Sequence, residues 1–155
     1  MIQRIQTLYL LAALVLMVLM LFLPFAEMAG ADGTIYRIGS GGLSRLGAGE
    51  MSPVSQSIPL LILILILVLL LLITIFLFRN RKLQMRICIY SIILEFGMIG
   101  LGYYYFFTAL RDIEVSETAF HLPVIIPVLS IILIYLAFRG IRKDEILIRS
   151  VDKIR

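Results

Sequence analysis

Glu95 is the only Asp, Glu, Lys or Arg inside the four long apolar runs of this sequence. It follows Arg86 by nine residues, which is about 13 Å along a helix. A carboxylate at that depth in lipid costs several kcal/mol unless it is protonated, paired or hydrated. We therefore expect either a neutral carboxyl group held by a hydrogen bond or a carboxylate that handles protons or cations.

Small and polar residues surround Glu95 at helical spacing. Those on the same helical stripe are Cys88, Ser91 and Gly102. Gly97 and Gly100 flank this stripe, and small residues allow helices in a membrane to approach closely. The pattern predicts that this helix lies centrally and contacts at least two others.

Ser130, in the last apolar run, is a candidate partner for Glu95. It precedes Arg139 by nine residues, which places it at the same depth as Glu95 if both segments are helices that enter from one side. We expect Glu95 to form a hydrogen bond with Ser130 or with a backbone carbonyl. The spacing leaves a structural role and a proton- or cation-handling role open.

Other chemistry in the sequence is sparse. An intramembrane zinc protease needs a pair of His residues, an aspartyl protease two carboxylates, and a serine protease a base near its nucleophile. The only His is His121, at the edge of an apolar run, and the glycine-rich stretch lacks Walker or Rossmann spacing. We expect no catalytic, metal-binding or cofactor-binding residue, no cofactor, and no enzymatic activity.

The apolar runs that carry these residues are long enough to cross a bilayer as helices. Apolar residues make up 61% of the 155 residues, and about 20 are needed per span. The predicted spans cover about residues 5–25, 58–78, 87–110 and 120–138. The sequence thus predicts a single all-α membrane domain over residues 1–155, with four transmembrane helices in a bundle. The second helix has no Gly, Ala or Ser between Leu60 and Phe78, which predicts a peripheral, lipid-facing position.

Basic residues indicate the orientation. One precedes the first run, four lie between the second and third, and six follow the fourth, out of 14 in all. The other three are Arg37, Arg45 and Arg111, on the opposite side with six acidic residues. The positive-inside rule then places both termini in the cytoplasm. The net charge of +4 follows this topology, so we expect no nucleic-acid binding.

Two segments outside the spans have recognisable patterns. In the external segment 27–57, residues 34–38 alternate weakly, and the glycines of 39–42 could turn them into a hairpin with 43–46. A solvated loop without regular structure is the alternative. The tail 140–155 is predicted to form an amphipathic cytoplasmic helix that lies on the membrane surface or binds a partner.

Three stretches resemble one known family. They are MIQRIQTLYLL at the start, IFLFRNRKLQMRICIY after the second run, and IRKDEILIRSVDKIR at the end. They resemble short four-span membrane proteins of Bacteroidetes that are classified as domain of unknown function 4293. The resemblance spans almost the whole chain and implies the inner membrane of a Gram-negative bacterium. It implies no activity, substrate or catalytic residue.

Two classes of function fit these observations. The first is a non-enzymatic membrane subunit or scaffold, whose partners are the lipid bilayer and another protein or a second copy. The alternative is a small oligomeric transporter or channel component that uses Glu95. Small multidrug exporters also have four spans and a membrane-embedded Glu, although in a different span.

Overall fold

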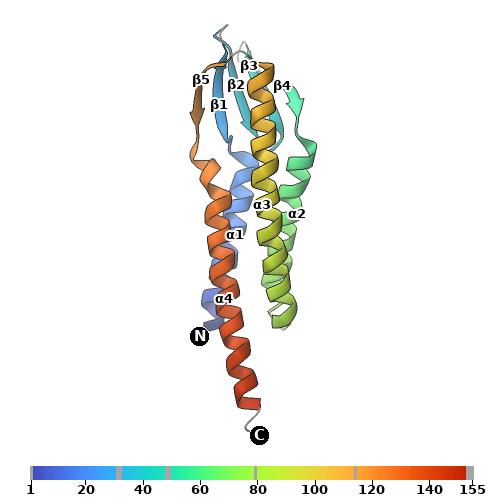
Figure 1. The fold of residues 1–155 in the computed structure, drawn as a ribbon, viewed down its shortest axis with the longest axis vertical. Coiled ribbons are helices and arrows are strands. Elements are labelled where there is room, and N and C mark those ends of the chain that lie inside the picture. Colours follow the sequence, from blue (N-terminus) through green and yellow to red (C-terminus); the bar gives the residue numbers. More distant parts are fainter. Residues whose placement is uncertain (1, 31–32, 48–49, 79, 114, 153–155) are drawn as a thin grey trace.

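Four long helices run side by side in a computed structural model, which describes residues 2–30, 33–47, 50–78, 80–113 and 115–152 (Figure 1). The helices are α1 (Ile2–Phe22), α2 (Ile58–Phe76), α3 (Arg81–Asp112) and α4 (Ile126–Asp152), with a 3-10 turn η1 (Leu122–Ile125) before α4. All four are long and apolar enough to cross a membrane by length and composition. The four predicted membrane-spanning helices are therefore confirmed as helices, with shifted ends.

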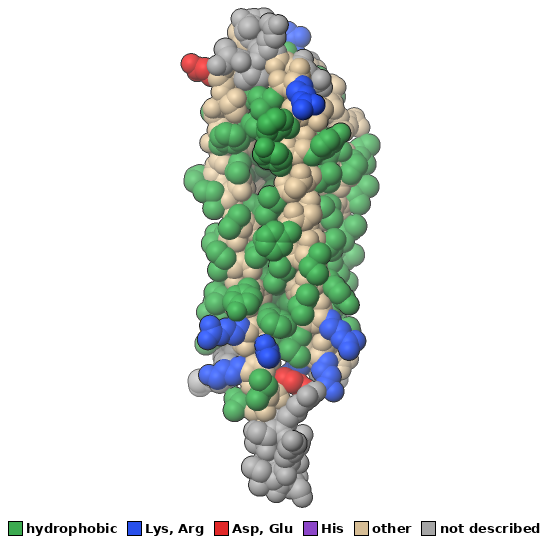
Figure 2. Space-filling view, in the orientation of Figure 1, with side chains coloured by type: hydrophobic (Ala, Val, Ile, Leu, Met, Phe, Trp, Pro, Cys, Tyr) green, Lys and Arg blue, Asp and Glu red, His purple; other side chains and the backbone are tan. Residues whose placement is uncertain are grey.

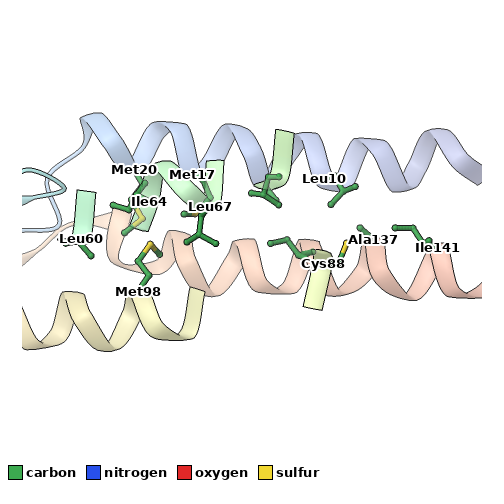
Figure 3. Packing of buried hydrophobic residues seen from close by; sticks show 13 residues of the cluster. Leu10, Met17, Met20, Leu60, Ile64, Leu67, Cys88, Met98, Ala137 and Ile141 are labelled. Atoms are coloured by element: carbon green, nitrogen blue, oxygen red, sulfur yellow. The ribbon is translucent and has the colours of Figure 1, made fainter. Parts of the chain in front are cut away.

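The bundle is a ring in which each helix packs against two others. α1 contacts α2 and α4, and α3 also contacts α2 and α4, with the α1–α4 pair the most extensive. Buried side chains from all four helices meet along the axis of the ring, as Figure 3 shows for residues such as Leu10, Leu67, Cys88 and Ala137. The expectation that α3 contacts at least two helices holds, but α3 is no more central than the others.

A five-stranded antiparallel sheet extends beyond one end of the bundle, so the predicted all-α fold class is wrong. Its strand order is β4-β3-β2-β1-β5. The strands are β1 (Ala26–Gly30), β2 (Ile35–Gly39), β3 (Gly42–Gly47), β4 (Glu50–Gln56) and β5 (Val115–Phe120). The sheet combines the external segment between α1 and α2 with the short link between α3 and α4.

The central hairpin of this sheet is the one that the glycine-rich turn predicts. β2 pairs with β3 in the register Ile38↔Leu43 and Gly39↔Gly42. Gly42 has a φ of 122°, which side chains disfavour, and a Cβ there would overlap the carbonyl oxygen of Ser55 on β4. Glycine is thus required where the turn enters β3.

Helix α3 joins the sheet to the bundle. Its 32 residues extend well past the membrane-spanning length, and its last turns cover one face of the sheet (Figure 1). Ala109 is buried there against Ala26, Met28 and Ile38, which alternate toward this face. The helix thereby fixes the position of the sheet relative to the bundle.

Two further expectations need correction. Helix α2 does not lie at the periphery, because Leu60, Ile64, Leu67 and Leu71 are each no more than 2% exposed. The tail is not a separate surface helix, because α4 continues through it without interruption to Asp152. In the tail, Ile141 is buried in the core of the bundle.

Candidate functional site

The centre of the bundle holds a hydrogen bond between α3 and α4. The hydroxyl of Ser130 donates to Oε1 of Glu95 over 2.6 Å, and both side chains are fully buried. The two residues meet because each lies at the same level of its helix and faces the interior. In apolar surroundings such a bond joins two helices whose buried neighbours are mainly hydrophobic.

Two polar atoms next to this bond have no hydrogen-bond partner among the described residues. They are Oε2 of Glu95 and the hydroxyl oxygen of Ser91, one helical turn earlier on α3. A buried polar group without a partner destabilises a protein by about 1–3 kcal/mol, which makes these atoms a candidate site for a proton or a small polar species. Glu95 is 0% exposed, so exchange with solvent would require the helices to separate.

The stripe predicted on α3 faces the interior over most of its length. Cys88 and Ser91 are fully buried like Glu95, and Gly102 further along is half-buried. Gly97 and Gly100 instead lie on the exposed side of α3, and a Cβ on either would meet nothing within 4 Å. The expectation that these two glycines bring helices of one chain together is therefore wrong.

The sequence did not predict a second polar cluster, on the outer face of the sheet. Arg37 on β2 donates from Nε to Oε1 of Glu27 on β1 over 2.7 Å, and Nε2 of His121 lies 3.5 Å from Oε2 of the same carboxylate. The hydrogen bond from Arg37 is the main reason that the pKa of Glu27 lies below its ordinary value. Glu27 pairs with Arg37 because the two residues are opposite each other in the register of β1 and β2. A prediction of an all-α fold contains no such register.

A buried polar contact at the other end of the bundle also went unpredicted. Nε2 of Gln6 on α1 donates to Oδ2 of Asp144 on α4 over 2.7 Å. Gln6 stood out only as a polar residue at the start of an apolar run. The sequence predicts that Asp144 lies in a helix on the membrane surface or against a partner, and neither position indicates a contact with Gln6.

None of these clusters suggests a metal site. Within the described ranges, no group of three or more His, Cys, Asp or Glu residues is placed to hold a metal ion. The arrangement at Glu95 can accept hydrogen bonds or exchange a proton, and the cluster at Glu27 is an ion pair beside a histidine.

Comparison with known proteins gives a family and no activity. No curated protein matches the chain in sequence. The sequence features and the four apolar helices agree with a match to one family model over residues 2–154. The chain belongs to the family described as a domain of unknown function (DUF4293).

Proposed function

We propose that this protein is a non-enzymatic membrane subunit that presents its β-sheet to a protein partner beside the membrane. The observation that carries the proposal is the single helix α3, which packs in the bundle at one end and against the sheet at the other. A sheet braced in this way keeps a fixed height and orientation above the lipid. Both edge strands, β4 and β5, are open to pairing with another chain.

The polar core supports a structural role for Glu95. Its bond to Ser130 ties α3 to α4 within a core that is mostly apolar. The sheet, by contrast, carries its exposed polar groups outside the membrane, where a partner could reach them. A scaffold needs this combination of a fixed bundle and an accessible platform.

Photo-crosslinking in native membranes tests the proposal. A photoreactive amino acid at Val54 on β4 or Ala119 on β5, both exposed, should give a discrete adduct with one other protein. The same group at Ile62 on α2, which is exposed on the side of the bundle, should react only with lipid. A lack of protein adducts at both strand positions would contradict the proposal.

The orientation is part of this proposal. Lys and Arg gather at the end of the bundle where the chain begins and ends, as Figures 1 and 2 show. Described members of this group are Arg81, Lys82, Arg86, Arg139, Arg142 and Lys143. The charge bias supports a cytoplasmic location for this end and a bacterial inner-membrane location for the protein, with the sheet on the outer side.

Thiol labelling of spheroplasts tests the orientation. Ser52→Cys on β4 should react with a membrane-impermeant reagent, and Lys143→Cys should not, since both positions are exposed but lie at opposite ends. The native Cys88 is fully buried and provides little background. The opposite pattern would reverse the orientation.

A second candidate function is proton-coupled transport. It is favoured by the oxygens of Glu95 and Ser91 that have no partner among the described residues, on side chains one helical turn apart and both buried in the bundle. Vesicles that contain the purified protein and a pH-sensitive dye would show a proton flux that Glu95→Gln abolishes. A scaffold predicts no such flux in the parent or in the variant.

A further inference from the structure

An apolar pocket lies at the junction between the bundle and the sheet. Its volume is about 180 Å³. Met20 on α1, Leu60 on α2 and Met98 on α3 form its inner wall, and all three are at least 95% buried. Figure 3 shows Met98 pointing across the interior toward Met20 and Ile64. Ala26 and Ile38 of the sheet complete the wall on the side away from the membrane centre.

The mouth of the pocket lies between α3 and the segment that leads into α4. Four exposed side chains line it, namely Ile99, Tyr103, Phe120 and Val124. Ile99 and Val124 belong to the helical segments that are apolar enough to span a membrane. The pocket therefore opens sideways, at the end of the spans nearest the sheet, where the surrounding solvent is lipid.

The lining determines which occupant is suitable. No residue that lines the pocket carries a charge, and nearly all of the lining surface is apolar. An apolar cavity of roughly 150 Å³ in a soluble protein stays dry and binds a hydrocarbon such as benzene. Left empty, the walls would also lose the dispersion contacts that close packing provides. A flexible hydrocarbon chain meets both conditions, whereas water or an ionic headgroup meets neither.

We propose that this pocket binds part of one acyl chain of a phospholipid from the leaflet next to the sheet, with entry between Ile99 and Val124. The headgroup stays outside at the level of Tyr103, whose ring is suited to the interface. A bound chain fills the space between the bundle and the sheet, and so supports the contact between them. This inference is independent of any protein partner of the sheet.

Gly102 supplies a way to close the pocket. It lines the pocket, and a Cβ built on it would meet nothing within 4 Å. The Cβ of Gly102→Leu therefore meets no neighbouring atom, and the rest of the side chain should extend into the pocket. Gly100→Leu is the matched control, because Gly100 has the same free space on the same helix but does not line the pocket.

The experiment uses the full chain in vesicles of bacterial phospholipid doped with a phospholipid that carries a photoreactive group midway along one acyl chain. After irradiation, peptide mass spectrometry of the parent and of Gly100→Leu should find adducts concentrated on the mouth and inner wall, at Met98, Ile99 and Val124. Gly102→Leu should lose this concentration and retain only the even labelling of lipid-facing positions such as Ile62. In gentle detergent, the parent and the control should also retain one phospholipid that Gly102→Leu lacks.

Three outcomes would overturn the inference. They are even labelling along α3 in the parent, equal labelling of the pocket in folded Gly102→Leu, and retention of an isoprenoid instead of a phospholipid. If Gly102→Leu fails to fold, Val124→Trp at the exposed mouth provides the second variant and should reduce pocket labelling in the same way. Failure here leaves the crosslinking test at Val54 and Ala119 unaffected, because those positions lie on the edge strands.

Discussion

The side chains of Gln6 and Asp144 are hydrogen bonded across 138 residues of sequence, with 2.7 Å between Nε2 and Oδ2. Both are only 8% exposed, so the bond forms inside the bundle between the beginning of α1 and the last third of α4. Gly140, one turn before Asp144, leaves room for Gln6. A Cβ at this glycine would lie 2.9 Å from Cγ of Gln6.

Gly140→Ala should therefore lower the thermal stability of the protein in detergent. The new methyl group displaces Gln6 and leaves Asp144 without that donor, at a cost of about 1–3 kcal/mol. The cost exceeds the roughly 1 kcal/mol that Ala gains over Gly in helix propensity. The control is Gly97→Ala, where the Cβ meets nothing and stability should stay the same or rise. Equal midpoints for the two variants would mean that Gln6 adapts without losing its bond.

The bond between Glu95 and Ser130 should contribute modestly to stability. Bonds between helices in membranes average about 0.6 kcal/mol in double-mutant cycles, because the separated helices also find partners. Glu95→Gln keeps an acceptor for the Ser130 hydroxyl and should unfold close to the parent, whereas Glu95→Leu should unfold at lower temperature. A cycle of Glu95→Leu with Ser130→Ala measures the coupling. A coupling near zero would show that the two side chains are neighbours without a stabilising bond.

The turn between β2 and β3 should not tolerate a side chain at Gly42, the first residue of β3. Gly42→Ala places a methyl group on the carbonyl oxygen of Ser55 and requires a positive φ of an L-residue. We expect loss of the β3–β4 pairing, measured as faster hydrogen exchange in both strands. Gly41→Ala is the control, since its Cβ has open space. Similar exchange in the two variants would show that the sheet can shift to accommodate Gly42→Ala.

The same turn illustrates which parts of the fold the sequence predicts. The hairpin of β2 and β3 is local, and its alternation and glycines are contiguous in the chain. Strands β1 and β5 are far apart in sequence, and β1 reads Ala-Glu-Met-Ala-Gly, which has little intrinsic preference for a strand. The pairing of β1 with β5 depends on tertiary contacts with α3. Local sequence patterns therefore predict loops or helix ends for both segments.

The contact between Glu95 and Ser130 could be predicted from the depth of the two residues in the membrane. Glu95 and Ser130 lie at equal distances from basic residues at one membrane edge, and the structure places them in contact. The pocket was not predictable, because its wall combines residues of all four helices with residues of the sheet that are far apart in the sequence. The sequence places Gly102 on the same helical stripe as Glu95, but nothing in the sequence indicates the open space beside this glycine.

The ion pair at the outer face of the sheet predicts a dependence of stability on pH. The pKa of Glu27 is lowered below its ordinary value of 4.5, chiefly by the hydrogen bond from Arg37. The folded state thus binds the proton of Glu27 less tightly than the unfolded state does. The stabilisation is present above pH 4.5 and is lost as the pH falls through the folded-state pKa.

Glu27→Gln isolates this contribution. The difference in unfolding midpoint between the parent and Glu27→Gln should be constant at neutral pH and should shrink below pH 4.5. When Glu27→Gln is compared with its parent in an Arg37→Gln background, the difference in unfolding midpoint should depend less on pH. The Arg37→Gln change removes the main cause of the lowered pKa of Glu27. A difference that grows on acidification would mean that Glu27 is stabilised in its protonated form instead.

Leu67→Ala tests the arrangement of helix α2. A helix composed almost entirely of Leu and Ile gives no sign in its composition of which side faces protein, and we expected α2 to face lipid. The structure places Leu67 at 0% exposure and Leu65, two residues earlier, at 47%. Truncation of Leu67 therefore leaves a cavity between helices that lipid cannot fill, whereas truncation of Leu65 leaves a surface that lipid covers.

We expect Leu67→Ala to lower stability by about 2 kcal/mol, at the low end of the range for buried leucines in soluble proteins. The low end applies because lipid rather than water solvates the separated helix. Leu65→Ala should change stability by less than about 0.5 kcal/mol, as exposed substitutions do. Unfolding midpoints in one detergent at one pH provide the comparison. Equal effects would place α2 outside the ring, with both leucines in lipid.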